Sequence, residues 1–499
     1  MNEFLKVILW GKEIGRLAWH PHKKTTYFIF NPDMLDGPLD IAPIVASIHD
    51  KRSHLPIYGE EERIYQKLPS FLADSLPDAW GNQLFEKWRI ENKLPRDQVT
   101  PIEKLAFIGK RGMGALEFEP ELNHGKTLDS IDLSSLANLA RRIMTERENL
   151  RILPNESLTL QSLIQVGTSA GGRQPKAIIA MNSKTGEIRS GQVGGLDDFG
   201  YYILKFGEKE RSAAEIEMTY FEMARLAGIE MMDSQLLAVD GINHFLTQRF
   251  DRKGTEKLHT QTLAALSPEA DSYEKLLWVC RKLRLPEVDC REVFRRMVFN
   301  ILANNTDDHN KNFTFIMNPQ GTWRLAPAYD MIYTFDTGGF LPNHNHCLMI
   351  GGKLDQITRE DVIRFAAENG IRRPEAVIRK VIEAISSFRS LAQKNGVQEQ
   401  WIGRIEHCIN EHLSAWGAAA RRMPLSFTTL NGHIIDDAHI EQAYKGNFHL
   451  IATIDGKPYK YIIRIGTKEH EFLIQTGLNQ VTDEQIKDLV EKFLLPKVK

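Results

Sequence analysis

Several features of membrane-bound, secreted and disulfide-stabilised proteins are missing from this sequence. No run of about eighteen apolar residues is present, so no membrane-spanning helix is expected. The first residues lack a basic stretch followed by an apolar one, so no secretory signal peptide is expected. The chain has only four cysteines, none in a Cys-x-x-Cys pair: Cys280, Cys290, Cys347 and Cys408. We therefore expect reduced thiols and a cytoplasmic protein.

An excess of one charge is lacking as well. The 63 Lys and Arg residues nearly balance the 65 Asp and Glu residues. The resulting net charge of -2 gives no global reason to bind nucleic acid or a membrane surface. At 499 residues the chain is too long for one ordinary core, so we expect roughly two to four domains.

The hydrophobic pattern changes along the chain and indicates an α+β protein. Short strands are predicted at 4–10, 15–19 and 27–30. Helical periodicity is found at 69–92, 132–148, 213–227 and through most of 270–420. The remainder of 158–250 alternates strands and turns. After residue 424 the sequence predicts a β-hairpin with strands at 448–454 and 459–465, then a helix at 483–494.

One polar loop has the spacing of a catalytic site. Asp307 and Asn312 are separated by four residues, and Asp330 follows eighteen residues after Asn312. In protein kinases an aspartate and an asparagine at this spacing orient the acceptor hydroxyl and bind Mg2+. The pattern predicts that Asp307 accepts the proton of the hydroxyl, while Asn312 and Asp330 hold the metal. A capped helix end is the alternative, because Asp, Asn and Thr are also capping residues.

Two basic residues of this loop complete the catalytic candidates. Lys311 is a candidate for neutralising the transferring phosphoryl group, or is simply solvated. His309 is expected to structure the loop rather than to transfer protons. Farther along, His344, His346 and Cys347 invite comparison with a metal site, but their spacing matches no common zinc framework. We expect a structural role for these three residues.

A loop of small residues precedes a predicted strand. Residues 167–172 read Gly-Thr-Ser-Ala-Gly-Gly, and Lys176 and an apolar run follow. Backbone N–H groups of such a loop can approach a polyphosphate closely. The loop is not a Walker A motif, because no Gly-Lys-Ser/Thr follows at that spacing. An ordinary hairpin turn is the alternative.

A lysine lies inside the apolar strand that follows. Lys205 ends the run Tyr-Tyr-Ile-Leu-Lys, and Glu217 lies twelve residues later in the helix predicted at 213–227. A strand lysine paired with a helix glutamate contacts the phosphates of ATP in kinases. Glu215 is a competing partner for Lys205, and a surface salt bridge or an edge-strand lysine are the alternatives.

These motifs together resemble one family, the HipA serine/threonine kinases, which are toxins of bacterial type II toxin–antitoxin pairs. The resemblance covers roughly residues 1–420. Its motifs are 73–81 (Ala-Asp-Ser-Leu-Pro-Asp-Ala-Trp-Gly), 167–176, 249–252, 305–312, 329–331 and 348–353. The resemblance implies a two-lobed protein-kinase-like fold with a β-rich N-terminal subdomain and a mostly helical C-lobe. It implies an N-terminal subdomain at 1–125, an N-lobe at 126–252 and a C-lobe at 253–424. The hairpin and helix pattern after residue 424 predicts a small α+β extension at 425–499.

The resemblance also implies roles for single residues. Asp307 matches the catalytic aspartate, Asn312 and Asp330 the Mg2+ ligands, and Asp251 the residue that reaches the ribose. Gln248 stands where some members have glutamate. Ser169, with Thr168 beside it, falls at a serine whose autophosphorylation silences the kinase. The ATP-binding set is Gly167, Thr168, Ser169, Ala170, Gly171, Gly172, Lys176, Lys205, Glu217, Gln248, Phe250 and Asp251.

The partners implied by the resemblance are a translation-related protein substrate, such as an aminoacyl-tRNA synthetase, and a HipB-like helix-turn-helix antitoxin. DNA would be contacted only through the antitoxin. Two other functions fit the same residues: a kinase-fold co-repressor with weak activity, and a small-molecule phosphotransferase. The segment 425–499 lies outside the resemblance and is either an interaction module or a family-specific addition.

Overall fold

A computed structural model shows two compact units, residues 1–416 and 417–499. In the first unit the structure describes residues 4–61, 63–122, 131–146, 157–167, 174–191, 198–334 and 345–416. In the second unit it describes the backbone of 427–428, 434–442, 447–454 and 457–464. Below, residues 4–122 are the N-terminal subdomain, 131–250 the N-lobe and 251–416 the C-lobe.

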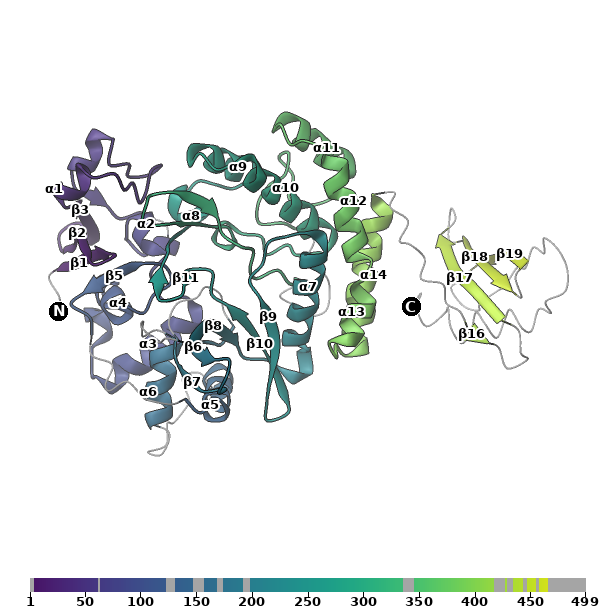
Figure 1. Ribbon diagram of the computed structural model, residues 1–499, viewed down its shortest axis with the longest axis horizontal. Helices are drawn as coiled ribbons and strands as arrows, with labels where there is room; N and C mark the ends of the chain where they lie inside the picture. Colours follow the sequence, from purple (N-terminus) through teal and green to yellow (C-terminus); the bar gives the residue numbers. More distant parts are fainter. Residues whose placement is uncertain are drawn as a thin grey trace. The chain divides into compact units, whose positions relative to one another are not determined.

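The N-terminal subdomain is built on an antiparallel sheet (Figure 1). Its strands, in the order β4-β3-β2-β1-β5, are β1 (Phe4–Leu9), β2 (Lys12–His20), β3 (Thr25–Phe30), β4 (Ile57–Tyr58) and β5 (Leu116–Glu119). Alternate residues of β1 are fully or almost fully buried, as in a strand with one face on a core. The three strands predicted near the start of the chain are confirmed.

The helices of this subdomain are α1 (Pro32–Leu35), α2 (Ser70–Ala73), α3 (Ala79–Glu91) and α4 (Pro101–Ile108). The single helix predicted at 69–92 is wrong, because it is interrupted between α2 and α3. Pro77 disfavours helical backbone in the residue before it. Asp78 then starts a new helix, since its side chain accepts a hydrogen bond from the N–H of Gly81 at 2.6 Å.

The N-lobe contains a five-stranded sheet in the order β7-β6-β8-β10-β9. The strands are β6 (Lys176–Asn182), β7 (Ile188–Ser190), β8 (Phe199–Lys205), β9 (Ser234–Val239) and β10 (Ile242–Gln248). The helices are α5 (Leu133–Glu146), α6 (Ser157–Val166) and α7 (Ala213–Ala227). Helices α5 and α7 confirm the prediction, whereas α6 corrects the assignment of its segment to strand and turn. The ten residues of α6 contain so many apolar side chains that the helical period of 3.6 cannot be told from the alternation of a strand.

One hydrophobic core joins the N-terminal subdomain to the N-lobe. It contains Trp80, Leu84 and Phe85 of α3 together with Leu163 of α6 and Leu204 of β8. Helix α7 connects the lobes in a different way. It packs on β9 and β10 of the sheet and on the C-lobe helices α12 and α13 (Figure 1). Both junctions lie within the first unit, so its parts are held together by packed side chains and not only by the segments that connect them.

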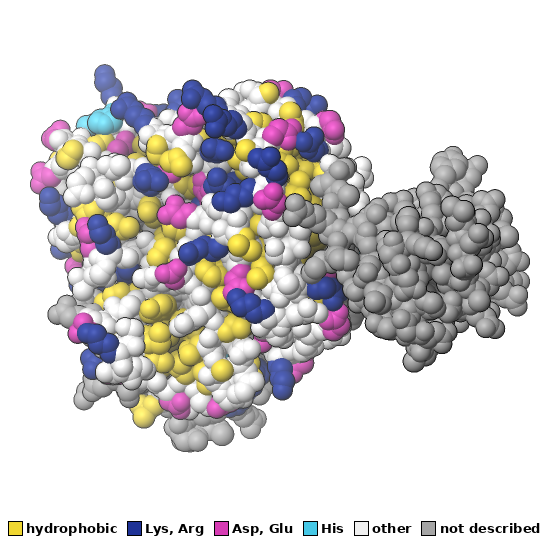
Figure 2. Space-filling view, turned by 45° about the vertical axis from the view of Figure 1, so that its right-hand side comes forward, with side chains coloured by type: hydrophobic (Ala, Val, Ile, Leu, Met, Phe, Trp, Pro, Cys, Tyr) yellow, Lys and Arg dark blue, Asp and Glu magenta, His cyan; other side chains and the backbone are white. Residues whose placement is uncertain are grey.

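The C-lobe is mostly helical, as predicted. Its helices are α8 (Leu263–Leu266), α9 (Tyr273–Lys282), α10 (Glu287–Leu302), α11 (Arg359–Glu368), α12 (Pro374–Ile385), α13 (Phe388–Lys394) and α14 (Glu399–Ala415). Its strands are β11 (Arg252–Lys253), β12 (Glu256–Lys257), β13 (His259–Thr262), β14 (Thr314–Met317) and β15 (Trp323–Leu325). On the face shown in Figure 2, acidic and basic side chains are interspersed, in keeping with the near-zero net charge. None of the helices that the structure describes is long and apolar enough to cross a membrane.

The second unit contains an antiparallel sheet in the order β16-β17-β18-β19. The strands are β16 (Phe427–Thr428), β17 (Ile434–Gln442), β18 (Asn447–Ile454) and β19 (Lys457–Arg464). The predicted hairpin is confirmed as β18 and β19, and β17 adds a long strand that the prediction lacked. The helix predicted at 483–494 lies outside the described residues.

Candidate active site

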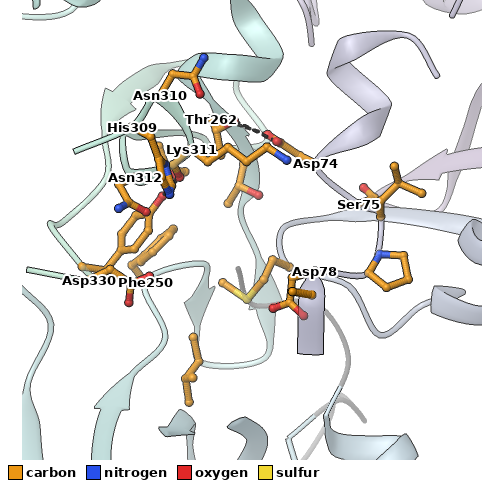
Figure 3. Close-up of a pocket in the computed structure, with 18 of the residues that line it drawn as sticks. Asp74, Ser75, Asp78, Phe250, Thr262, His309, Asn310, Lys311, Asn312 and Asp330 are labelled. Atoms are coloured by element: carbon orange, nitrogen blue, oxygen red, sulfur yellow. Dashed lines mark hydrogen bonds between the residues drawn. The ribbon is translucent and has the colours of Figure 1, made fainter. Parts of the chain in front are cut away.

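A cavity of about 790 Å³ opens where the N-terminal subdomain, the N-lobe and the C-lobe meet. Most of the candidates that the structure describes face it. They are Lys205, Glu217, Gln248, Phe250, His309, Lys311, Asn312 and Asp330. Figure 3 shows the loop residues His309 to Asn312 and Asp330 on one side, with Asp74, Ser75 and Asp78 of the N-terminal subdomain facing them. The fold therefore brings together residues that are more than 200 positions apart in the sequence.

A buried ion-pair network lies at the centre of the cavity. The ammonium group of Lys205, the last residue of β8, contacts a carboxylate oxygen of Glu217 on α7 and one of Asp330. The competing partner Glu215 instead accepts a hydrogen bond from Asn243 at 2.8 Å. Lysine and glutamate are thus paired as the sequence pattern suggested, and Asp330 joins them.

Burial and charge act against each other in this network. Burial would lower the pKa of Lys205, but the carboxylates of Asp330 and Glu217 raise it above its usual value. Burial raises the pKa of Glu217, and Lys205 offsets this only in part. Burial would also raise the pKa of Asp330, but attraction to Lys205 and Lys176 keeps it below its usual range. Asp330 is therefore ionised at neutral pH and suited to bind a cation.

Asp330 and Asn312 provide oxygen atoms of the kind that Mg2+ prefers. Asp330 has a left-handed backbone (φ 52°), an uncommon conformation for a residue other than glycine. The Nδ2 of Asn312 donates to the carbonyl of Asp307 at 2.7 Å, which leaves Oδ1 as the atom to ligate a metal. Within the described parts of the chain, no cluster of three His, Cys, Asp or Glu side chains is arranged to hold a metal ion. Mg2+ bound through one carboxylate, one amide and substrate phosphates does not need such a cluster.

The polar loop that contains Asp307 and Asn312, the candidate catalytic loop, follows α10 and ends in a turn at 310–312. The amide of Asn312 donates to the carbonyl of His309 at 2.9 Å, closing this turn. The amide of Asp307 donates to the hydroxyl of Thr334 at 3.1 Å. The side chain of Asp307 is 64% exposed, and a carboxylate oxygen lies 3.9 Å from Nε2 of His309. Asp307 is not among the residues that line the cavity, so its carboxylate faces the solvent beside them.

Sequence reasoning missed the residue that supports this loop. Asp308 is buried, and it accepts hydrogen bonds from Tyr273 Oη at 2.7 Å and from the backbone of Cys347 at 2.8 Å. The Nδ1 of His346 lies 2.8 Å from the same carboxylate. The structural role expected for His346 and Cys347 is thus to bind the catalytic loop. His344 lies outside the described residues.

The Gly-rich loop is described only at its ends, because residues 168–173 lie outside the described parts. At the first end, a Cβ on Gly167 would lie 2.3 Å from Cδ1 of Leu84 and 2.7 Å from the carbonyl oxygen of Leu163, so a larger residue would require this backbone to shift. At the other end, Lys176 begins β6 directly opposite Lys205 in β8. Lys176 is 2% exposed, and its ammonium group lies 3.4 Å from Asp78.

The hinge candidates differ in their surroundings. Gln248 and Phe250 line the cavity, and the ring of Phe250 stacks on Tyr329 with 5.6 Å between centroids. Asp251, in contrast, is fully buried and bonded to Arg249 and Arg252. Burial would raise the pKa of Asp251, but the two guanidinium groups lower it to about 2. Asp251 is therefore a structural ion-pair residue here, and its carboxylate is not placed to reach a ribose.

The chain has a protein-kinase-like fold. It has two lobes, a strand lysine paired with a helix glutamate, and a polar loop beside this pair. Two family models match it: the HipA N-terminal domain over residues 5–119 and the HipA-like C-terminal domain over residues 168–390. The chain belongs to the HipA family.

Relatives with assigned names are similar over parts of the chain. A putative kinase of Haemophilus influenzae is 27% identical over 198 residues, which are 36% of this chain and 56% of the relative. The serine/threonine-protein kinase toxin HipA of Shewanella oneidensis is 23% identical over 252 residues, which are 45% of this chain and 54% of the relative. The chain thus spans about half the length of the curated relatives it matches.

Among solved structures, the fold matches a chain of the Shewanella oneidensis HipA, HipB and operator DNA complex. The TM-score is 0.59 at 17% identity, and the match covers 83% of this chain and 98% of the other. At this identity the likeness supports the fold: a mixed α+β, HipA-like kinase architecture.

Proposed function

We propose that this protein is an ATP- and Mg2+-dependent serine/threonine protein kinase. The observation that carries the proposal is the contact of Lys205 with both Glu217 and Asp330 inside a cavity that the catalytic loop also lines. Kinases position the phosphates of ATP with a strand lysine paired to a helix glutamate and with an aspartate that binds Mg2+.

The residues around the cavity have distinct roles in this proposal. Asp307 accepts the proton of the substrate hydroxyl, for which its exposed carboxylate is available to a large acceptor protein. Asn312 and Asp330 would hold Mg2+, which neutralises charge on the β- and γ-phosphates when bound. Lys205 contacts the same phosphates, and Lys311 stabilises charge on the transferring group. His309, whose Nε2 lies 3.9 Å from a carboxylate oxygen of Asp307, stabilises the conformation of the loop.

The nucleotide would lie between the sheet and the hinge. Phe250 and Gln248 are proposed to contact the adenine, with the backbone of the hinge supplying the hydrogen bonds. Gly167 to Gly172 are proposed to cover the phosphates. Lys176 is left out of this role because its ammonium group is buried beside Asp78 and does not line the cavity. Asp251 is left out of this set because its carboxylate is buried between two arginines.

Transfer of label from γ-labelled ATP to an acceptor protein or to the chain itself tests the proposal. Wild type, Asp307→Ala and Asp330→Ala are compared at equal concentration, with and without EDTA. We expect incorporation by the wild type only, and only with Mg2+. Equal incorporation by all three proteins would contradict the assignment of the site. Small phosphate acceptors, tested in parallel, separate a protein kinase from a small-molecule phosphotransferase.

The biological setting is proposed from the relatives. One is named a kinase toxin, and the matching structure contains HipB and operator DNA. We propose that this protein acts in the cytoplasm, inhibits growth by phosphorylating a translation-related protein such as an aminoacyl-tRNA synthetase, and binds a HipB-like antitoxin. Expression without a partner should arrest growth in the wild type but not in Asp307→Ala. Arrest by neither protein would favour a co-repressor role, and arrest by both would show that the toxicity does not need Asp307.

A further inference from the structure

The segment Asp74–Asp78 connects α2 to α3 and forms one wall of the cavity (Figure 3). It reads Asp-Ser-Leu-Pro-Asp and belongs to the N-terminal motif at 73–81, to which the proposed function gives no task. Its two ends are attached to different lobes. Asp74 binds the C-lobe, and Asp78 binds the N-lobe.

At the first end, Asp74 is bonded to a strand that supports the catalytic loop. One carboxylate oxygen accepts the backbone N–H of Thr262 at 2.7 Å, and the other accepts its hydroxyl at 2.9 Å. Thr262 ends β13 and lies opposite Thr314, the first residue of β14, two residues after the loop. Nearby, the hydroxyl of Ser70 in α2 donates to the carbonyl of Ala265 at 2.9 Å. The anchor on the C-lobe is therefore a set of buried or partly buried hydrogen bonds.

At the second end, Asp78 is bonded to the strand beside the phosphate-binding lysine. Its Oδ2 lies 3.4 Å from Nζ of Lys176, and both side chains are less than 10% exposed (9% and 3%). Trp80 donates its indole N–H to the carbonyl of Lys176 at 2.9 Å. Since Lys176 pairs with Lys205 across the sheet, Asp78 holds the strand that faces the ion-pair network. Charges interact more strongly at such a site than in water, because little water is present to screen them.

We propose that the segment Asp74–Asp78 is a strap that fixes the spacing of the two lobes, with Asp74 and Asp78 as positioning residues for phosphoryl transfer. The chain itself passes between the lobes at the hinge, and the strap is a second connection at the cavity. One anchor sets the position of β6 and thereby of β8 with Lys205. The other sets the position of the catalytic loop through β13 and β14. The inference rests on the proposed function, because this spacing matters for catalysis only if the cavity transfers phosphoryl groups.

Two substitutions break the two anchors separately. Asp78→Asn removes the charge that pairs with Lys176, but it keeps a side-chain oxygen to cap α3, as Asp78 Oδ1 does for Gly81. Asp74→Ala removes both acceptors of Thr262. Glu86→Gln is the matched control, since it removes a carboxylate from α3 that forms a partly exposed ion pair with Arg89 of the same helix. Where Asp74→Ala fails to fold, Thr262→Val removes one of the two hydrogen bonds, together with the cap that the same hydroxyl provides for α8.

The kinetic test separates positioning from binding. We expect each strap variant to lower kcat, normalised per nucleotide-binding site, by roughly tenfold to a hundredfold, because misplacing reacting groups by about 1 Å has effects of this size. KM for ATP should change by less than about threefold, since the hinge and Lys205 remain. The double variant should be no slower than the slower single one, because either break permits the same movement. If the two substitutions act independently, their effects on kcat will multiply in the double variant, and this result would overturn the strap proposal.

Hydrogen exchange supplies a measurement that does not need activity. Amides of β13 and β14 should exchange faster in Asp78→Asn, although this residue belongs to the other anchor, and at the wild-type rate in Glu86→Gln. Unchanged exchange in β13 and β14 of Asp78→Asn rejects the strap, whatever the activity. A wild type that incorporates no phosphate rejects the proposed function alone, and the exchange result still decides the strap.

Discussion

The ammonium group of Lys205 contacts the carboxylate of Asp330 directly, joining the end of β8 to the segment that follows β15. Glu217 contacts the same ammonium group, so a single positive charge is shared by the buried carboxylate of Glu217 and the partly exposed carboxylate of Asp330. Removing the lysine would leave two negative charges close together with no cation bonded to either. This arrangement makes the pH dependence of stability a test of the network, separate from its activity.

Substitution of Lys205 by methionine should reverse the effect of mild acid on stability. In Lys205→Met the paired carboxylates repel each other, and their folded-state pKa values rise above the unfolded value of about 4. The folded chain then binds more protons than the unfolded one, so stability should increase as pH falls from 7 to 5. At pH 7 we expect a loss of about 3 kcal/mol and no phosphoryl transfer. Urea unfolding at several pH values measures this.

A lysine on the surface serves as the control for this substitution. Lys275 of α9 forms an exposed ion pair with Asp271, and Lys275→Met should change the free energy of unfolding by less than about 1 kcal/mol. If Lys205→Met shows the same stability as wild type at pH 7 and the same pH profile, the positive charge of Lys205 does not stabilise the carboxylates of Glu217 and Asp330.

Asp308 should stabilise the conformation of the candidate catalytic loop, in which Asp307 is the proposed catalytic residue. Asp308→Asn keeps the size of the side chain but replaces one acceptor oxygen with an NH2 group, which is a donor. The groups that donate to Asp308 include Tyr273 Oη and the backbone N–H of Cys347. We expect a loss of about 1–3 kcal/mol in the free energy of unfolding. The transfer rate should fall, while KM for ATP changes little. Asp271→Asn, on the exposed surface, is the control, and equal stability of the two variants would contradict the role of Asp308.

The local parts of the site could be predicted from sequence because they lie close together in the chain. Asp307 and Asn312 share one loop, and Lys205 and Glu217 belong to consecutive elements, so spacing and periodicity were informative. The contacts of Asp74 and Asp78 could not be predicted, since their partners are 188 and 98 residues away. Asp307 and Asp308 are also indistinguishable as residue types. Only packing shows that one is exposed and the other buried.

A buried histidine beside the cavity should determine part of the acid sensitivity of the fold. His259 in β13 is fully buried, and burial lowers its pKa to about 4. An unfolded histidine has a pKa of about 6.5, so the unfolded chain binds the extra proton between these values. Stability from neutral His259 is therefore complete above pH 6.5 and is lost as pH falls toward 4. The contribution lost between pH 7.5 and pH 5 should be about 2 kcal/mol.

Two substitutions measure this contribution. His259→Phe retains a ring against Trp323, whose centroid lies 5.8 Å away, and should flatten the pH profile of unfolding in urea. His407→Gln, on the exposed surface of α14, should leave the profile unchanged. Identical profiles for wild type and His259→Phe would show that His259 does not titrate on unfolding.

Autophosphorylation at Ser169 would connect the Gly-rich loop to self-silencing. The loop lies between Gly167, packed on α3, and Lys176 in β6. A phosphate on Ser169 would add about two negative charges where the phosphates of ATP are proposed to bind, and repulsion would disfavour the nucleotide.

We expect wild type incubated with Mg2+ and ATP to lose activity as the peptide containing Ser169 becomes phosphorylated. Ser169→Ala should keep its activity and be more toxic in cells. Thr168→Ala is the control, and a phosphopeptide map that is unchanged in Ser169→Ala but altered in Thr168→Ala would move the modification to Thr168.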